Sequence, residues 1–215
     1  MIKNIKRRIL PLIPVGIGFL WFFILQLVMT SPRYILYVRL DDYIPFVPIF
    51  IVPYVLWYFY MAAPFLLLFR RDYREYLRYC KAIAATLIVT CFIYSVWTNG
   101  INLRPDLTGR AGIFTEVIRV LYEVDSPMNS APSLHTSLGV IAHMGFVRYL
   151  GRGRRTRFAR AISLIYCILN AASTVLIKQH SIIDTAGGLL LALIICALWA
   201  VSTPRVRGTK ILRTY

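Results

Sequence analysis

Six apolar stretches, each about as long as a bilayer is thick, limit this chain to one solvent, the membrane. They cover residues 10–29, 45–69, 80–97, 133–149, 161–177 and 182–201. A helix needs about 20 apolar residues to cross a hydrocarbon core of roughly 30 Å. The chain is 58% hydrophobic and has a mean hydropathy of +0.63, unlike a water-soluble domain. Because alternating strand patterns are absent, we expect an all-α integral membrane protein, a bundle of six transmembrane helices in a single domain over residues 1–215.

The first stretch follows four basic residues and so resembles the start of a secretory signal peptide. It is long for the apolar part of such a peptide and contains Trp21. It also runs into Thr-Ser-Pro-Arg at residues 30–33 without a small-x-small cleavage site. We therefore expect this stretch to be kept as a span.

The basic residues, which give the chain a net charge of +16, are distributed unevenly about the spans. Nineteen of the 25 Lys and Arg lie on one side of a six-span chain, in residues 1–8, 70–81, 148–160 and 205–213. Seven of the nine Asp and Glu lie on the other side. This positive-inside pattern predicts a multi-pass protein of the plasma (inner) membrane with both termini in the cytoplasm. It also explains the arginine clusters by topology and contact with anionic lipid, without nucleic-acid binding.

The longest segment outside the spans is the outer loop at residues 98–132, between the third and fourth spans. Apolar residues in it recur at helical spacing, namely Ile113, Phe114, Val117, Ile118 and Leu121. We expect an extracytoplasmic amphipathic helix here. Such a helix either covers the bundle as a connector or roofs a site of lipid entry, and the pattern alone does not decide between the two.

Two polar runs stand at the outer ends of spans and hold two of the three histidines: residues 129–136 and 178–184. His135 and His180 each precede or begin a span that runs inward, where the N–H groups of a helix terminus favour a phosphate. Asp184 follows His180 by one helical turn, so its carboxylate can hold one ring nitrogen while the other faces a substrate. The third histidine, His143, lies deep in a span, and we expect it to have a structural or tuning role.

In the order and spacing of three motifs, the segment from residue 97 to about 188 resembles the type 2 phosphatidic acid phosphatase superfamily of membrane lipid phosphatases and phosphotransferases. Arg104-Pro105 matches the end of the first motif, and Pro132-Ser133-Leu134-His135 matches the second. The third motif matches through Ser173, His180 and Asp184. The resemblance implies the same six-span arrangement. It also implies a site with catalytic residues His180, His135 and Asp184 and substrate-binding residues Arg104, Ser133, Lys178 and Ser173.

The chain departs from the family pattern at two positions. Trp97 stands where the first motif usually has Lys, and Thr174 stands where the third usually has Arg. Lys178 is a candidate replacement for one of these cations. The Lys-Gln-His run, together with Asp125 and Asn129, resembles most the branch that includes inositol phosphorylceramide synthase-like phosphotransferases.

The resemblance also implies a mechanism, in which His180 attacks phosphorus to form a phosphohistidine while His135 exchanges protons with the leaving and accepting oxygens. Since side chains would stabilise the phosphoryl charge, neither a metal nor another cofactor is expected. The expected reaction is hydrolysis of a phosphomonoester or diphosphate lipid, and the substrate is a phospholipid or a polyprenyl phosphate within the bilayer.

Other functions remain open at this point. A phosphotransferase would use an alcohol in place of water as the acceptor. A small transporter or a non-catalytic membrane scaffold would use the same polar end without phosphoryl transfer. Transporters usually carry ionisable residues through mid-membrane and internal repeats, and this chain has little beyond His143 and no visible repeat. The lipid that is bound and the oligomeric state are also open.

Overall fold

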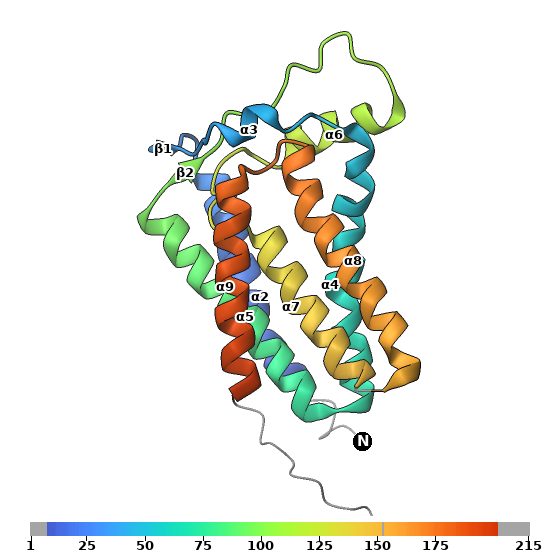
Figure 1. Cartoon of the computed structure of the whole chain (residues 1–215). Coiled ribbons are helices and arrows are strands. Elements are labelled where there is room, and N and C mark those ends of the chain that lie inside the picture. Colours follow the sequence, from blue (N-terminus) through green and yellow to red (C-terminus); the bar gives the residue numbers. More distant parts are fainter. Residues whose placement is uncertain (1–7, 152, 202–215) are drawn as a thin grey trace, which may run out of the picture.

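The computed structural model describes residues 8–151 and 153–201, and these form a bundle of long helices with short elements gathered at one end (Figure 1). The elements are, in chain order, η1 (Leu10–Leu12), α2 (Ile13–Val28), β1 (Tyr34–Ile35), α3 (Leu40–Tyr43), η2 (Pro48–Phe50), α4 (Ile51–Arg71), α5 (Tyr73–Val96), β2 (Asn99–Gly100), α6 (Ile113–Val124), α7 (Leu134–Leu150), α8 (Arg154–Leu176) and α9 (Ile182–Val201).

Five helical segments of the described residues are long and apolar enough to cross a membrane: Leu10–Val28, Pro48–Arg71, Tyr73–Val96, Arg154–Leu176 and Ile182–Val201. Each overlaps a predicted stretch, so the sequence was right about a nearly all-α integral membrane protein. The remaining stretch, 133–149, forms α7, which has 17 residues and a length of about 25 Å at 1.5 Å per residue. Because α7 is shorter than the other five, a sixth span stays a prediction.

The centre of the bundle is α7, which packs against α4, α5, α8 and α9. Its side chains Leu138, Ile141 and Ala142 are fully buried. Leu138 and Ile141 belong with Ile83 and Leu87 of α5 to the main apolar core. Close van der Waals packing of these side chains inside the bundle holds α7 in place, and with it the polar run at the start of α7.

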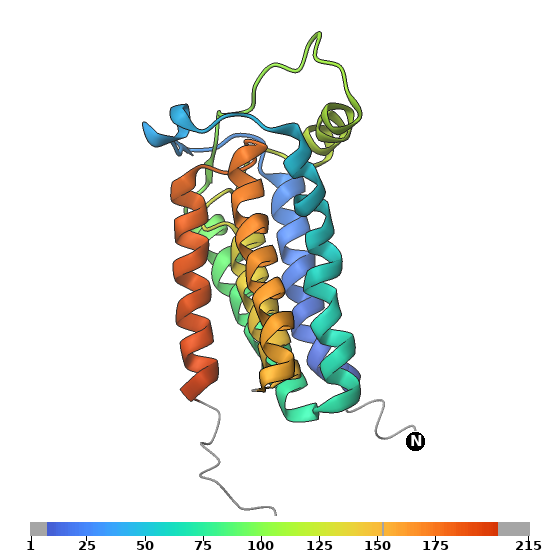
Figure 2. The ribbon, with the colours of Figure 1, turned by 45° about the vertical axis from the view of Figure 1, so that its right-hand side comes forward.

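One end of the bundle carries all the short elements between the helices (Figure 2). There β1 pairs with β2 in parallel, with Tyr34 opposite Asn99 and Ile35 opposite Gly100. The turn from α8 to α9 and the loop into α7 lie at the same end. This end is therefore where the predicted motif residues come together.

The loop at residues 98–132 contains one helix, α6, at the place where helical spacing was seen in the sequence. Ile118 is fully buried and packs with Ile51 and Ile177. Three of the apolar residues that recur at helical spacing, Ile113, Phe114 and Val117, are instead exposed. The helix thus presents apolar residues on more than one side, and its placement at a membrane surface stays a prediction.

Candidate active site

The two polar runs enclose a small cavity at the end of the bundle that carries the short elements. Its volume is about 50 Å³, more than the ~10–15 Å³ that one water molecule needs. The lining residues come from α2, α4, α5, the loop before α7, the first turn of α7 and the turn before α9. They are Phe22, Gln26, Tyr54, Tyr94, Asp125, Ser126, Met128, Asn129, Ser130, Leu134, His135, Gln179 and His180.

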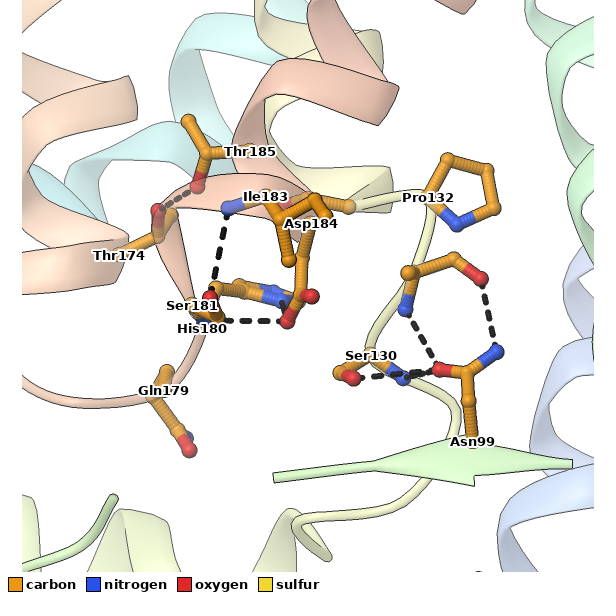
Figure 3. A network of polar contacts seen from close by, with 12 residues as sticks. Asn99, Ser130, Pro132, Thr174, Gln179, His180, Ser181, Ile183, Asp184 and Thr185 are labelled. Carbon is orange, nitrogen blue, oxygen red and sulfur yellow. Dashed lines mark hydrogen bonds and ion pairs between the residues drawn. The ribbon is translucent and has the colours of Figure 1, made fainter. Parts of the chain in front are cut away.

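His180 and Asp184 lie together, one helical turn apart, as their spacing predicts (Figure 3). Nδ1 of His180 is 3.5 Å from Oδ2 of Asp184, a distance that allows an ion pair but exceeds a normal hydrogen bond. The same Oδ2 accepts a 3.0 Å hydrogen bond from the Ser181 N–H. Asp184 is fully buried, so the carboxylate is fixed behind the histidine and His180 Nε2 is the ring nitrogen left for a substrate.

His135, the second residue of α7, is held between two aromatic rings of α4. The Tyr54 ring stacks on one side at a centroid distance of 4.0 Å, and the Trp57 ring stacks at 3.9 Å. Nε2 of His135 is 3.1 Å from the Tyr54 carbonyl oxygen. Because a carbonyl only accepts, Nε2 carries a proton, and in the neutral ring Nδ1 is free to take another.

Arg104 joins three segments around the cavity. Its guanidinium donates to the carbonyl oxygens of Tyr122 at 3.0 Å and Asp125 at 2.6 Å, and to Oε1 of Gln179 at 2.5 Å. It also lies over the Tyr122 ring at 4.4 Å. Burial lowers the pKa of Arg104, while the nearby Asp125 carboxylate raises it. The predicted phosphate ligand is thus next to the cavity, with most of its donors already bonded to the protein.

Asn99 is a residue at this site that sequence analysis did not select. It is fully buried, and its Oδ1 accepts from the Ser130 N–H at 3.0 Å and the Ala131 N–H at 2.8 Å (Figure 3). Its Nδ2 donates to the Ala131 carbonyl oxygen at 2.9 Å. One amide therefore fixes the loop that leads to His135. An Asn-Gly pair directly after a span was the available signal.

Asp41 was also missed, and it fixes the turn before α9. Its carboxylate accepts from Ser181 Oγ at 2.7 Å and from the Ile182 N–H at 3.0 Å. Lys178 donates from Nζ to the Asp41 carbonyl oxygen at 2.8 Å. Lys178 has a left-handed backbone, with a φ of +55°, and its ammonium is not among the groups that line the cavity. Burial lowers the pKa of Lys178, and Asp41 and Asp42 raise it.

The two predicted serines stand behind the cavity wall. Ser133 is the N-cap of α7, and its hydroxyl accepts from the Thr136 N–H at 3.3 Å. Ser173 donates to the Asn170 carbonyl oxygen at 2.6 Å. Of the two departures from the family pattern, Thr174 bonds to the Ala171 carbonyl oxygen and Thr185, and Trp97 ends α5.

A second, apolar hollow of about 790 Å³ runs between α7, α8 and α9. Thr136 and Thr185, which line it, are the chain neighbours of His135 and Asp184. Farther along, His143 lines the same groove, and its Nδ1 is 2.9 Å from Ser163 Oγ. His143 therefore has a polar partner within the helices. The groove gives an apolar molecule a place beside the polar cavity.

The arrangement places two imidazole rings, one buried carboxylate and one guanidinium at or beside one cavity. These are the groups that nucleophilic phosphoryl chemistry requires: a nucleophile, a proton carrier, an orienting acid and a cation. Within residues 8–151 and 153–201, no three His, Cys, Asp or Glu side chains are grouped as ligands for a metal ion.

Comparison with known proteins agrees with this chemistry. The sequence model of the PAP2 superfamily matches residues 75–207, which is more than half of the chain and includes all three motifs. Comparison with curated protein sequences gives no significant match. The family match suggests an activity on lipid phosphates, of the phosphatase or phosphotransferase type. On the family match and the three motifs, the chain belongs to the PAP2 superfamily, the type 2 phosphatidic acid phosphatases.

Proposed function

We propose that the chain is a lipid-phosphate phosphatase that hydrolyses a phosphomonoester or diphosphate lipid through a phosphohistidine on His180. The observation that carries this proposal is the 3.5 Å contact between His180 Nδ1 and the Asp184 carboxylate at a cavity that also contains His135. Asp184 holds Nδ1 of His180, which leaves Nε2 for attack on phosphorus. The family match supports the reaction class.

The reaction proceeds in two displacements. First, His180 Nε2 bonds to phosphorus as the bond from phosphorus to the lipid oxygen breaks, and protonated His135 gives its Nδ1 proton to that oxygen. Second, His135 takes a proton from water, the water oxygen bonds to phosphorus, and the N–P bond breaks to release phosphate. Arg104 stabilises the phosphoryl charge in both steps. Ser133 caps the helix that presents His135, and Lys178 holds the turn that presents His180.

The proposed site faces the extracytoplasmic side of the plasma (inner) membrane. The basic clusters at residues 70–81 and 148–160 flank the ends of helices opposite to the motif residues, and the positive-inside rule assigns such ends to the cytoplasm. Both termini are then cytoplasmic. The helix α7, fourth in chain order, brings the number of spans to six, and α6 lies at the outer surface.

The groove between α7, α8 and α9 supports a substrate with a long apolar chain. It is lined almost entirely by apolar side chains and begins beside residues next to His135 and Asp184. A phospholipid or polyprenyl phosphate would place its phosphate in the cavity and its chain against these helices. A groove of this size is within the usual range for binding sites of small molecules.

The test is phosphate release by the purified protein from a panel of lipid phosphates in the presence of EDTA. We expect turnover to persist in EDTA, because side chains supply the charge and the nucleophile. His180→Ala is expected to reduce turnover by more than about 10³-fold, as is typical when a nucleophile is removed.

Arg154→Ala is the control variant, since Arg154 is exposed at the other end of the bundle. It should retain full turnover, and all proteins should elute as folded particles in size-exclusion chromatography. Full turnover by His180→Ala, or turnover that EDTA abolishes, would contradict the proposed mechanism.

Phosphoryl transfer to an alcohol is the second candidate function. It differs from hydrolysis only in the acceptor that attacks the phosphohistidine. The Asp125 carboxylate in the cavity wall favours it, because a carboxylate accepts a hydrogen bond from a hydroxyl group and repels a free phosphate. Formation of a phosphorylated alcohol in the same assay would distinguish transfer from hydrolysis.

A further inference from the structure

Asn129 is a buried residue of the cavity wall whose side-chain amide is unpaired. It is 3% exposed and lines the cavity, and neither Oδ1 nor Nδ2 has a hydrogen-bond partner among the described residues. Leaving both atoms of a buried amide unpaired is unfavourable, and the large majority of buried polar atoms in proteins are bonded. The amide therefore has both a donor and an acceptor to offer a polar molecule in the cavity.

The backbone around Asn129 is fixed independently of its side chain. The Asn129 N–H donates to the Asn99 carbonyl oxygen at 2.6 Å, and the Asn99 amide holds the next two residues. Asn129 has a φ of +54°, in the left-handed region that Asn adopts more readily than most residues. Such conformations occur often at ligand sites, where surrounding structure maintains them.

The same wall carries a hydrogen-bond acceptor that a phosphate does not need. The Asp125 carboxylate accepts from Gln26, Tyr54 and Gln179 at 3.4, 3.3 and 3.2 Å, at or beyond the long end of the normal range. Phosphoryl oxygens only accept hydrogen bonds, so they gain nothing from this carboxylate. A hydroxyl group both donates and accepts, and it is complementary to Asp125 and Asn129 together.

We infer that Asn129 and Asp125 form a subsite for a hydroxyl group of a polyol, next to His180. Asp125 accepts the hydroxyl hydrogen, and Asn129 Nδ2 donates to the hydroxyl oxygen. This inference rests on the proposed function and adds the class of molecule that shares the cavity with the phosphate. The hydroxyl comes either from the head group of the lipid phosphate or from an alcohol acceptor. In the acceptor case the oxygen of a neighbouring hydroxyl of the same polyol bonds to phosphorus, the N–P bond to His180 breaks, and His135 takes the proton of that second hydroxyl.

Two assays separate these sources of the hydroxyl. In the first, the protein turns over a lipid phosphate in glycerol or myo-inositol, and the ratio of phosphorylated polyol to inorganic phosphate is measured. In the second, kcat/KM is compared between phosphatidylglycerophosphate, whose head group carries a hydroxyl, and phosphatidate, whose head group is phosphate alone. Each ratio is internal to one variant, so a general loss of activity does not change it.

Asn129→Gly removes the amide and suits the left-handed backbone. Its matched control is Asn102→Gly, because Asn102 is an exposed residue of the same loop. We expect Asn129→Gly to lower at least one of the two ratios by about tenfold, the effect of losing one or two hydrogen bonds. Asn102→Gly is expected to change neither ratio.

Unchanged ratios in Asn129→Gly, or a wild-type protein indifferent to both polyol and head-group hydroxyl, would overturn the subsite while leaving the proposed function intact. If no lipid phosphate is hydrolysed at all, the proposed function fails, and the subsite is tested by binding alone. In that test, myo-inositol should raise the Tm of His180→Ala more than that of the His180→Ala, Asn129→Gly double variant. Equal shifts would overturn the subsite.

Discussion

Two carboxylates accept hydrogen bonds from backbone N–H groups at the start of α9, and this limits where a phosphate can bind. Asp41 accepts from the Ile182 N–H, and Asp184 accepts from the Ser181 N–H. These N–H groups are not available to a phosphate, contrary to what their place at a helix terminus predicts. We therefore expect side chains around the cavity to stabilise the phosphoryl oxygens, with Arg104 the nearest cation of the matched motifs.

The burial of the Asp125 carboxyl group makes the stability of the protein depend on pH. Its loss of solvent raises its pKa above the ordinary value of 3.8, while His180 and Arg104 act to lower it. The folded protein then holds this proton more tightly than the unfolded chain does. Linkage requires that this contribution to stability be present at low pH and be lost as pH rises from about 4 through the raised pKa.

Asp125→Asn removes this titration and is expected to flatten the decline of stability with rising pH. Thermal unfolding in detergent from pH 4 to pH 8 measures the change, and each unit of pKa difference corresponds to about 1.4 kcal/mol. Asp106→Asn is the control, since a hydrogen bond from the Thr108 N–H lowers the pKa of Asp106. That exposed group has the opposite sign, adding stability that is lost as pH falls. Identical pH profiles for wild type and Asp125→Asn would contradict the assigned direction.

At the level of helices, α9 and the start of α7 are packed backbone to backbone. The Ser133 N–H donates to the Asp184 carbonyl oxygen at 3.0 Å. Gly188, one turn farther along α9, faces the same residue, and a Cβ at Gly188 would overlap the Ser133 carbonyl oxygen. This close approach joins the second and third motifs, so the distance between the two histidines depends on a residue that touches neither.

Gly188→Ala is therefore expected to push α9 away from α7 and to reduce turnover by more than about tenfold, with about 1–3 kcal/mol lost from the free energy of unfolding. The control is Gly187→Ala, for which the nearest atom to a new Cβ is Pro132 Cβ at 3.6 Å, an ordinary contact. Both variants replace Gly by Ala within α9, so the change in helix propensity is the same and only the packing of the new Cβ differs. Equal turnover in the two variants would show that this contact does not position the site.

At the scale of the whole molecule, the sequence predicts the features that depend on the order and spacing of residues along the chain. The helices and their apolar lengths follow from hydropathy, because bilayer thickness sets the length of a span. The i,i+4 spacing of His180 and Asp184 likewise predicts their proximity within one helical turn. The family follows from three motifs in order, and the match over residues 75–207 confirms it.

The contacts that hold the site depend on segments far apart in the chain, and the sequence does not predict them. Asp41 and Ser181 are 140 positions apart, and Asn99 and Ser130 are 31 apart. Lys178 shows the same limit at short range, since its left-handed backbone precedes a turn and its ammonium contacts Asp41. Proximity to His180 in sequence was therefore a poor guide to where that side chain binds.

Because the groove and the polar cavity are separate, we expect that a substitution in the groove can change the binding of the lipid chain without changing the reaction at the phosphate. Ala172→Phe on α8 places a ring in the groove and is expected to displace about two methylenes of a bound chain. Because the displaced methylenes lose their packing contacts with the groove, KM for a long-chain lipid phosphate should rise several-fold. A short-chain, water-soluble phosphate ester should keep its KM, because it does not reach the groove.

Ala161→Phe, at an exposed position of the same helix outside the groove, serves as control. A similar rise in KM for both substrates would mean that the chain binds elsewhere.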